Sequence, residues 1–448
     1  MIKYYSTNLK APEVSFSQAI LKGLAPDGGL YMPTSIPSLD KDVIESFSSL
    51  KYNEIAFKVL YSFLKEEIDE EYLQSLCDDA YNFDVPLEKV TDNSYVLRLD
   101  QGPTASFKDF AARMMARLMN HFIQRDKQHY TILTATSGDT GSAVASAFHG
   151  LDGIDVIILF PQKEVTDMQR KQMTTLGDNV KVIAIDGKFD DCQRLVKQAF
   201  TDPLFADRHL SSANSINIGR LLPQSVYYCY AWSRIKDDGR KVIFSVPSGN
   251  YGDLMGGIIA REMGLPVDKY IIAANANNEV PEYLKSGIYT PIVPSINCIS
   301  SAMNVGHPSN LARIVALYDG VMDEKGKIFK QPDLDKLRKD FYAISISDEE
   351  TEETILSSYK QQNVLLEPHG AVAWTGINNY LTDNYVENTN FVSLETAHPF
   401  KFKKEIVKLL GFQPEPSYAL KGLEEKKEEY TEMPNDYNEL KHFIINNK

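Results

Sequence analysis

The 448 residues are too many for one compact core, and a composition of 43% hydrophobic and 24% charged residues is ordinary for a globular protein of two or three domains. The 61 acidic residues outnumber the 47 basic ones, and the net charge of −14 disfavours nucleic acid or an anionic membrane as the main partner. We expect a cytoplasmic protein, because the chain has no signal-peptide pattern, no apolar run of about 18 residues and no CxxC pair among its four cysteines.

A strand, a glycine-rich turn and a helix recur along the chain, after an N-terminal stretch that is poorer in this pattern. Strands are expected where apolar runs of strand length occur, at 95–99, 131–136, 156–160, 180–185, 242–246 and 270–273. Helices are expected after three of these strands, at 107–123, at 142–148 and from the turn at 249–253 to about 262. Such alternation predicts parallel sheets covered by helices, which is the α/β class.

We expect two doubly wound α/β domains and an N-terminal segment. The predicted parts are an N-terminal segment at 1–92, a larger domain made of 93–130 and 225–448, and a smaller domain at 131–224. In the tail from 421, the charged run at 424–429 predicts a surface helix.

One lysine stands at the start of the apolar helix that follows Gly102 and Pro103. Lys108 lies between Phe107 and Phe110, where burial and the helix N-terminus both disfavour a cation and should lower the pKa of its amine. A neutral lysine amine is what Schiff-base chemistry requires. The same motif also suits a surface lysine that extends its ammonium group into water, so the motif alone leaves both alternatives open.

Two glycine-rich turns, at 137–141 and 249–253, each connect a strand to a helix. Free backbone N–H groups at such a turn suit a phosphate or a carboxylate, although each turn alone is also an ordinary tight connection. Neither turn matches GxxxxGK[ST] or GxGxxG, which disfavours nucleotide binding. The eight histidines include no HExxH motif, so no metal site is expected.

Taken together, the motifs resemble the threonine synthase family, whose members are fold-type II (tryptophan-synthase β-like) enzymes that use pyridoxal 5′-phosphate. The fragments that carry the resemblance are GLAPDGGLY at 23–31, GPTASFKD at 102–109, ATSGDTG at 135–141, QMTT at 172–175, NSIN at 214–217 followed by Arg220, PSGNYGD at 247–253, EPHGA at 367–371 and TAHP at 396–399. They span nearly the whole chain, and their order is more specific than any one of them. The resemblance implies that both α/β domains are of the tryptophan-synthase β-like type.

The resemblance implies that Lys108 is the catalytic residue that carries the cofactor. The implied cofactor-binding residues are Lys108, Gly249, Asn250, Tyr251, Gly252, Asp253, Thr396 and Asp139. The turn at 249–253 would hold the phosphate, and the hydroxyl of Thr396 would lie beside the pyridine nitrogen and leave it largely unprotonated. Some relatives in the wider fold have asparagine in place of Asp139. Because an ionised aspartate would repel the cofactor's phenolate, we expect Asp139 to be protonated or turned away.

The resemblance also implies the substrate O-phospho-L-homoserine, which the family converts with water into L-threonine and phosphate. The implied substrate-binding residues are Thr136, Ser137 and Thr140 at the carboxylate, and Asn214, Ser215 and Arg220 at the phosphate. For Asn214, a structural role at a helix start is the alternative.

Three other functions remain open from the sequence. A related phospho-lyase would use the same residues, whereas a serine/threonine dehydratase needs no phosphate site and is disfavoured by the segment at 214–220. A protein that only binds the cofactor or an amino acid is disfavoured by the intact Lys108. We expect a monomer or a homodimer.

Overall fold

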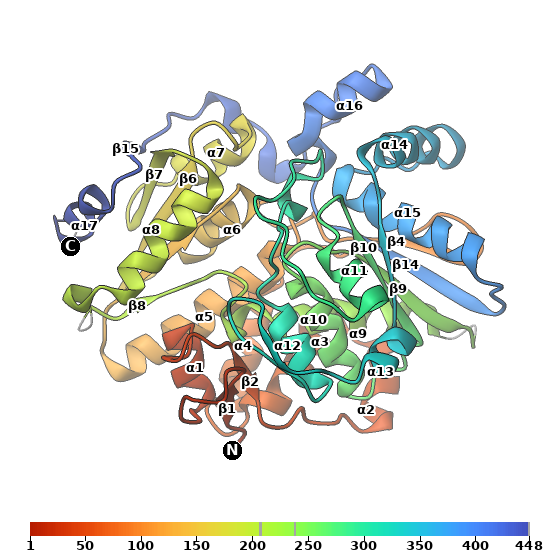
Figure 1. Ribbon diagram of the computed structural model, residues 1–448, viewed down its shortest axis with the longest axis horizontal. Coiled ribbons are helices and arrows are strands. Elements are labelled where there is room, and N and C mark those ends of the chain that lie inside the picture. Colours follow the sequence, from red (N-terminus) through yellow and green to blue (C-terminus); the bar gives the residue numbers. More distant parts are fainter. Residues whose placement is uncertain (206–207, 237–238, 447–448) are drawn as a thin grey trace.

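The computed structural model describes residues 1–205, 208–236 and 239–446, in which two main sheets stand side by side, each covered by helices on both faces (Figure 1). The larger sheet contains, in spatial order, β13 (Phe341–Ser345), β10 (Lys269–Ala274), β9 (Lys241–Pro247), β14 (Thr389–Glu395), β4 (Ser94–Arg98) and β3 (Leu87–Lys89). The smaller sheet contains β15 (Thr431–Pro434), β7 (Val180–Asp186), β6 (Ile154–Pro161), β5 (Tyr130–Ala135) and β8 (Leu210–Ser211). Within these two sheets, the described strand pairs are parallel except β3 with β4.

The larger sheet is apolar on both faces because helices cover both. On β9, Ile243 packs in a cluster with Trp374 of α15, while the next residue, Phe244, packs on the opposite face with Tyr228 of α9. The helices associated with this sheet are α9 (Ser225–Ile235), α10 (Gly252–Glu262), α11 (Glu279–Ser286), α12 (Leu311–Leu317), α13 (Leu334–Asp340), α14 (Asp348–Gln362), α15 (Pro368–Asp383) and α16 (Lys403–Leu410). A short hairpin of β11 (Val321–Met322) and β12 (Ile328–Lys330) lies between α12 and α13 in the chain.

The smaller sheet shows the same alternation. Leu133 of β5 and Ile157 of β6 belong to a cluster with α8, whereas Ile132 and Val156 face the central core on the other side. The helices associated with this sheet are α6 (Asp139–Phe148), α7 (Asp167–Thr174), α8 (Phe189–Thr201) and α17 (Tyr437–Asn446). Two parallel sheets with both faces covered are the doubly wound architecture that the sequence predicts, and the fold class is confirmed.

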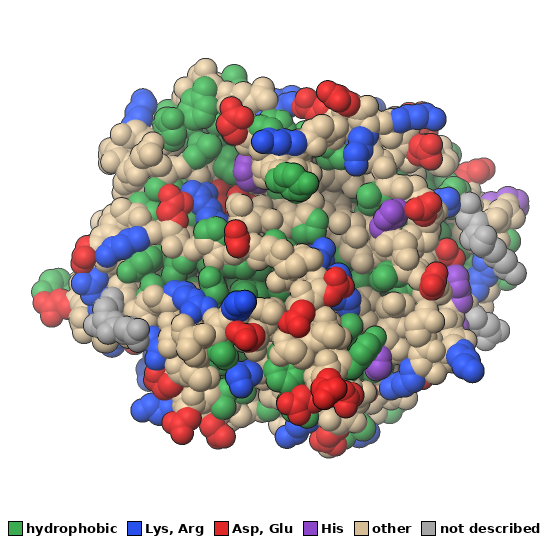
Figure 2. All heavy atoms as spheres, turned by 180° about the vertical axis from the view of Figure 1, so that it is seen from behind, with side chains coloured by type: hydrophobic (Ala, Val, Ile, Leu, Met, Phe, Trp, Pro, Cys, Tyr) green, Lys and Arg blue, Asp and Glu red, His purple; other side chains and the backbone are tan. Residues whose placement is uncertain are grey.

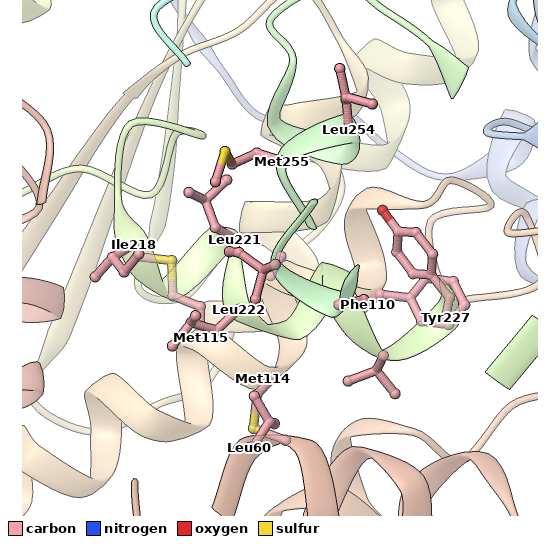
Figure 3. Packing of buried hydrophobic residues seen from close by; sticks show 14 of the residues in the cluster. Leu60, Phe110, Met114, Met115, Ile218, Leu221, Leu222, Tyr227, Leu254 and Met255 are labelled. Carbon is pink, nitrogen blue, oxygen red and sulfur yellow. The ribbon is translucent and has the colours of Figure 1, made fainter. Parts of the chain in front are cut away.

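The helix α5 (Lys108–Asp126) joins the two halves, and its methionine-rich face is part of the central core (Figure 3). The side chains labelled there come from α3 (Tyr52–Leu64), α5, the segment 218–224 with its 3-10 turns η3 (Ile218–Arg220) and η4 (Leu222–Gln224), α9 and α10, and they are Leu60, Phe110, Met114, Met115, Ile218, Leu221, Leu222, Tyr227, Leu254 and Met255. Phe110 and Tyr227 meet edge to face with ring centroids 5.6 Å apart. This core therefore fixes the relative positions of the three segments that carry Lys108, Arg220 and the turn at 249–253.

The N-terminal segment packs against this core from below in Figure 1. Its elements are β1 (Tyr4–Ser6), α1 (Phe16–Lys22), β2 (Tyr31–Pro33), α2 (Lys41–Ser46), α3 (Tyr52–Leu64) and α4 (Glu70–Ala80). Tyr52 of α3 contacts Phe110 of α5 and Tyr230 of α9, with ring centroids 5.3 and 5.4 Å apart. The segment thus supports the helix that begins at Lys108.

The C-terminal tail differs from the expectation. The charged run at 424–429 contributes only to a short 3-10 turn, η9 (Leu423–Glu425), and then continues extended, because Glu428 accepts hydrogen bonds from Arg170 and Thr174 of α7. The chain next forms β15, which pairs with β7 of the smaller sheet. The tail therefore does not belong with the larger sheet, where the grouping of 225–448 had placed it.

The surface seen in Figure 2 mixes acidic and basic side chains without separating them into areas of one sign. Among the described residues, no helix is both long enough and apolar enough to cross a membrane.

The packing of the tail predicts a specific loss of stability. Leu440 of α17 is fully buried in the cluster with α8, so Leu440→Ala should lower the free energy of unfolding by about 2–5 kcal/mol. Leu204→Ala, the same change at a leucine that is 52% exposed, should cost much less. Urea unfolding of both variants measures the difference, and equal losses would contradict the packing of α17 described above.

Candidate active site

The predicted site residues all follow the carboxyl ends of parallel strands, where ligands bind in open α/β sheets. The segment that carries Lys108 follows β4, and the turn at 136–140 follows β5. The turn at 249–253 follows β9, and Thr396 follows β14. Phe107 N donates to Thr396 O at 2.9 Å, so the start of α5 lies directly beside the end of β14. The structure thus brings these four segments, which are far apart in the sequence, to one place.

Lys108 is the first residue of α5, and its Nζ lies 4.5 Å from the centroid of the Phe107 ring. Burial lowers the pKa of its amine, and the positive charges of Arg220 and Lys401 lower it further. The carboxylates of Asp139 and Asp253 act in the opposite direction. A lysine whose ammonium form is disfavoured can react as a neutral amine, as the sequence predicts.

The turn after β5 uses Thr136 to hold its own backbone. Thr136 Oγ1 accepts hydrogen bonds from the N–H groups of Gly138 at 2.9 Å and Gly141 at 2.8 Å. Gly138 has a φ of 134°, and a Cβ there would lie 2.4 Å from the side chain of Gln169, so the turn requires glycine. Ser137 and Thr140 remain partly exposed beside the N-terminus of α6 and can reach a bound carboxylate.

Asp139 is buried, and its contacts favour one of the two alternatives expected from the sequence. Burial raises the pKa of its carboxyl, but Lys401 and Lys108 outweigh this effect and hold the pKa well below its usual range. Asp139 Oδ1 lies 2.7 Å from Lys401 Nζ and accepts a hydrogen bond from Gln169 Nε2 at 3.0 Å. The carboxyl group is turned toward Lys401, which is one of the two expected alternatives, and this ion pair favours its ionised form over the protonated alternative.

The turn at 249–253 has the shape of an anion cradle. Tyr251 has a left-handed backbone with φ of 60° and caps α10, whose first N–H groups have no partners within the helix. A Cβ at Gly249 would lie 2.8 Å from Met303 Cα, so only glycine fits there. A Cβ at Gly252 would lie 3.3 Å from Ser215 Cβ, a tight contact that a small shift of this side chain relieves, so packing constrains Gly252 less than Gly249. These N–H groups and the neighbouring Lys108 fit a phosphorylated aldehyde cofactor.

Asp253 is the last residue of this turn, and its carboxylate is bound by two tyrosine hydroxyl groups. Its Oδ1 accepts hydrogen bonds from the hydroxyl groups of Tyr227 at 2.6 Å and Tyr228 at 2.7 Å. Burial raises the pKa of its carboxyl to about 6, although both hydrogen bonds act in the opposite direction. Asp253 thus anchors the first turn of α10 to α9.

A second anion site is formed by Asn214, Ser215 and Arg220. Arg220 is buried and donates to Ala213 O at 2.7 Å, and burial lowers its pKa to about 10. Within the described part of the chain, Arg220 Nε and Asn214 Oδ1 have no hydrogen-bond partner, and no carboxylate lies within ion-pair distance of Arg220. Asn214 Nδ2 donates to Ala135 O at 3.1 Å. A buried cation with an unused donor fits an anionic ligand.

Arg313 is a site residue that the sequence motifs did not indicate. It is fully buried and donates to the carbonyl oxygens of Tyr31, Ser215 and Ile216. It also donates to Asn310 Oδ1 at 2.7 Å. An arginine on a short apolar helix carries no local signal of this role, because its carbonyl partners are all distant in the sequence and only Asn310 is a local partner.

Thr396 lies at the end of β14 and leads to a second set of residues that the motifs left without a role. Thr396 Oγ1 donates to Glu367 Oε1 at 3.5 Å. The other oxygen of Glu367 lies 2.5 Å from His369 Nδ1, and His369 Nε2 accepts a hydrogen bond from Ala302 N at 3.0 Å. Since Nε2 is an acceptor, the ring proton is on Nδ1 and is donated to Glu367. His369 therefore positions a carboxylate and is not available as a ligand.

Three family models match the chain, and together they span it almost completely. The model described as "Threonine synthase N terminus" matches residues 3–81, "Pyridoxal-phosphate dependent enzyme" matches 85–397, and "Threonine synthase, C-terminal" matches 370–444. The threonine synthase of Haemophilus influenzae is 40% identical over 442 residues, which cover 98% of this chain and 99% of that protein. The threonine synthase of Escherichia coli is 40% identical over 412 residues, which cover 92% and 91%.

Solved structures show the same relationship. The pyridoxal-phosphate-bound threonine synthase from Brucella melitensis has a TM-score of 0.92 at 35% identity, with 100% of this chain and 99% of that chain covered. Yeast threonine synthase has a TM-score of 0.90 at 32% identity, with 99% and 98% covered. A threonine deaminase from Solanum lycopersicum has a TM-score of 0.55 at 18% identity, with 90% and 96% covered, and shares the fold alone.

The geometry of the turn at 249–253 makes Gly252 the better position at which to test cofactor binding. Gly252→Ala should weaken cofactor retention without lowering the thermal midpoint of the apoprotein, because alanine favours the first turn of a helix but places a methyl group beside the cradle. The measurements are the cofactor dissociation rate and the apoprotein midpoint. Gly249→Ala is the contrasting variant and should lower the midpoint, because its Cβ would meet the backbone of Met303. Normal retention by Gly252→Ala would argue that the turn is only structural.

Proposed function

The chain belongs to the threonine synthase family of pyridoxal-phosphate-dependent lyases, and we propose that its own substrate is O-phospho-L-homoserine, which it converts with water into L-threonine and phosphate. The observation that carries this substrate assignment is the pair of separate anion sites. The cradle at 249–253 takes the cofactor's phosphate, which leaves the buried guanidinium of Arg220 for a second phosphate. That second phosphate is the leaving group of the substrate.

Asn214, Ser215 and Arg220 are proposed to bind and orient the substrate's phosphate. The unused Nε–H of Arg220 would donate a charge-assisted hydrogen bond to the phosphate, and the partly exposed hydroxyl group of Ser215 would donate a second hydrogen bond. Ser137 and Thr140 are proposed to bind the substrate's carboxylate at the N-terminus of α6. Thr136 is proposed to act in the same place, with its hydroxyl oxygen shaping the turn and its one proton left to donate.

Bound pyridoxal phosphate supplies the electron sink that stabilises negative charge at the substrate's carbon atoms. Lys108 Nζ, as a neutral amine, is proposed to move protons at the α and β carbons. Thr396 Oγ1 is proposed to hold the pyridine ring at the end of β14, with Glu367 orienting the hydroxyl. If Arg220 retains the phosphate that leaves, this phosphate would be placed to accept a proton from the attacking water.

The alternative within the enzymes is a serine/threonine dehydratase or a related phospho-lyase. A dehydratase removes water from an uncharged hydroxyl and has no use for a buried arginine with an unused donor. A phospho-lyase would use the same pocket and would differ in its product, which the assay below identifies.

All four cysteines are free thiols, which supports the proposal of a reducing, cytoplasmic location. A monomer or a homodimer stays a prediction.

The proposed reaction predicts phosphate release that depends on Lys108 and on a phosphorylated substrate. The wild type should form L-threonine and phosphate in equal amounts from O-phospho-L-homoserine and should not turn over homoserine, which lacks the leaving group. Lys108→Ala should reduce kcat on the order of 10²–10⁴-fold, because the proton-transfer group is lost. A coupled phosphate assay with amino-acid analysis measures both products, and comparable turnover of homoserine would overthrow the assignment.

The phosphate site predicts a selective effect of Arg220→Lys. Lysine keeps the charge but loses the planar set of donors, which should cost roughly 1.5–3 kcal/mol, or about tenfold to a hundredfold in kcat/KM for O-phospho-L-homoserine. Binding of threonine, which has no phosphate, should be almost unchanged when it is measured from the visible spectrum. Arg194→Lys on the exposed face of α8 is the matched control. If Arg220→Lys weakens both ligands equally, Arg220 is structural and the phosphate binds elsewhere.

A further inference from the structure

Lys401 is a buried lysine that none of the roles above uses. It lies in the 3-10 turn η7 (Pro399–Phe402), and its side chain is 0% exposed. Its Nζ lies 2.7 Å from Asp139 Oδ1 and donates to Thr104 O at 2.8 Å. Lysine is almost never fully buried without a partner, so this pair fixes where the side chain points.

The contacts of Lys401 join three segments that meet beside Lys108. Asp139 begins α6 on the smaller sheet, and Lys401 follows β14 on the larger sheet. Thr104 lies four residues before Lys108, and its carbonyl oxygen also accepts a hydrogen bond from Gln172 of α7 at 2.9 Å. The ammonium group thus links the segment just before Lys108, through Thr104, with residues that follow strands of both sheets.

The charges around Lys108 are nearly balanced. Asp139 and Asp253 raise the pKa of its amine, and Arg220 and Lys401 lower it, while burial has the largest effect and also lowers it. The groups that feel the charge of Lys401 are Lys108, Asp109, Asp139 and His398. Removing Lys401 would leave Asp139 as an unpaired carboxylate beside Lys108.

We propose that Lys401 is a positioning residue whose ammonium group holds the Asp139 carboxylate and neutralises it, so that the amine of Lys108 stays neutral and able to react. The ion pair has no net charge and donates and accepts hydrogen bonds, so in this position it is electrostatically similar to a neutral amide. An aspartate is thereby tolerated where its bare charge would attract a proton to Lys108 and repel an anionic cofactor oxygen. The inference rests on the proposed function, because it assigns Lys108 as the cofactor lysine.

A double-mutant cycle on the apoenzyme tests this without measuring turnover. The variants are Lys401→Met, Asp139→Asn and the double variant, and methionine preserves most of the length of the buried side chain without its charge. The rate at which the visible absorption band appears after mixing with pyridoxal phosphate reports the neutral fraction of Lys108, and its midpoint is measured against pH. Lys403→Met, the same change at a neighbouring lysine that is 36% exposed and paired with Glu424, is the matched control.

Lys401→Met should raise the midpoint by about one pH unit or more, since an opposite charge within a few ångströms shifts a pKa by that amount. The same substitution in the Asp139→Asn background should shift it much less, because the carboxylate through which Lys401 acts is gone. Lys403→Met should leave the midpoint unchanged.

Two outcomes overturn the inference. An unchanged midpoint in Lys401→Met, with only a lower thermal midpoint of unfolding, would make Lys401 a structural residue. Equal shifts in both backgrounds would show that Lys401 acts directly on Lys108 and not through Asp139. The phosphate-release assay separates these outcomes from failure of the proposed function: a wild type that makes threonine but shows either outcome overturns this inference alone.

Discussion

Cations buried at the meeting point of two parallel sheets are the constraint on which the site depends. Arg220, Arg313 and Lys401 are all almost completely removed from solvent, and a buried charge must be paired or hydrogen-bonded. Lys401 forms an ion pair with the carboxylate of Asp139. Arg313 donates hydrogen bonds to backbone carbonyl oxygens and to the side chain of Asn310. Arg220 has one carbonyl oxygen and an unused donor. The protein satisfies two of these cations internally and leaves a donor of the third, Arg220, unused, which supports the proposal that it binds an anionic substrate.

The parts of the fold that the sequence predicted are those with a local signal. The strands β4, β5, β6, β7, β9 and β10 were identified because buried parallel strands are continuous apolar runs, and Lys108 became a candidate because its motif lies at a helix start. The tail was mispredicted because the run of charges at 424–429 looks like a solvated helix. Its extended path depends on Arg170, more than 250 residues away in the sequence. No periodicity within the tail contains that information.

Asp139 shows that the same limit applies when the protonation state of a side chain is predicted from the sequence. From the sequence, an aspartate close to a phenolate suggested a carboxyl group that is either protonated or turned away. The structure favours the second alternative because Lys401, far along the chain, supplies a cation at 2.7 Å. A pKa depends on neighbours in space, so sequence reasoning can identify the residue that needs a partner but not the partner. Lys401 did lie two residues beyond the TAHP fragment, and that is the only local signal it gave.

The turn at 249–253 and the turn that carries Ser215 are joined by one hydrogen-bond network, in which a single buried arginine, Arg313, supports both turns. Asn250 of the cofactor turn donates to Ser215 Oγ of the substrate turn at 2.5 Å, and its Oδ1 accepts from Ser309 N at 2.7 Å. Asn310 donates to Asn250 O, and Arg313 holds both Asn310 and the carbonyl oxygen of Ser215. Displacement of either turn would therefore break hydrogen bonds to the other. Donors that are fixed before the ligands arrive need no reorganisation during the reaction, which is the condition under which buried hydrogen bonds contribute most to catalysis. The position of Ser215, a proposed phosphate ligand, is thus set by Arg313 through its carbonyl oxygen and by Asn250 through its hydroxyl group.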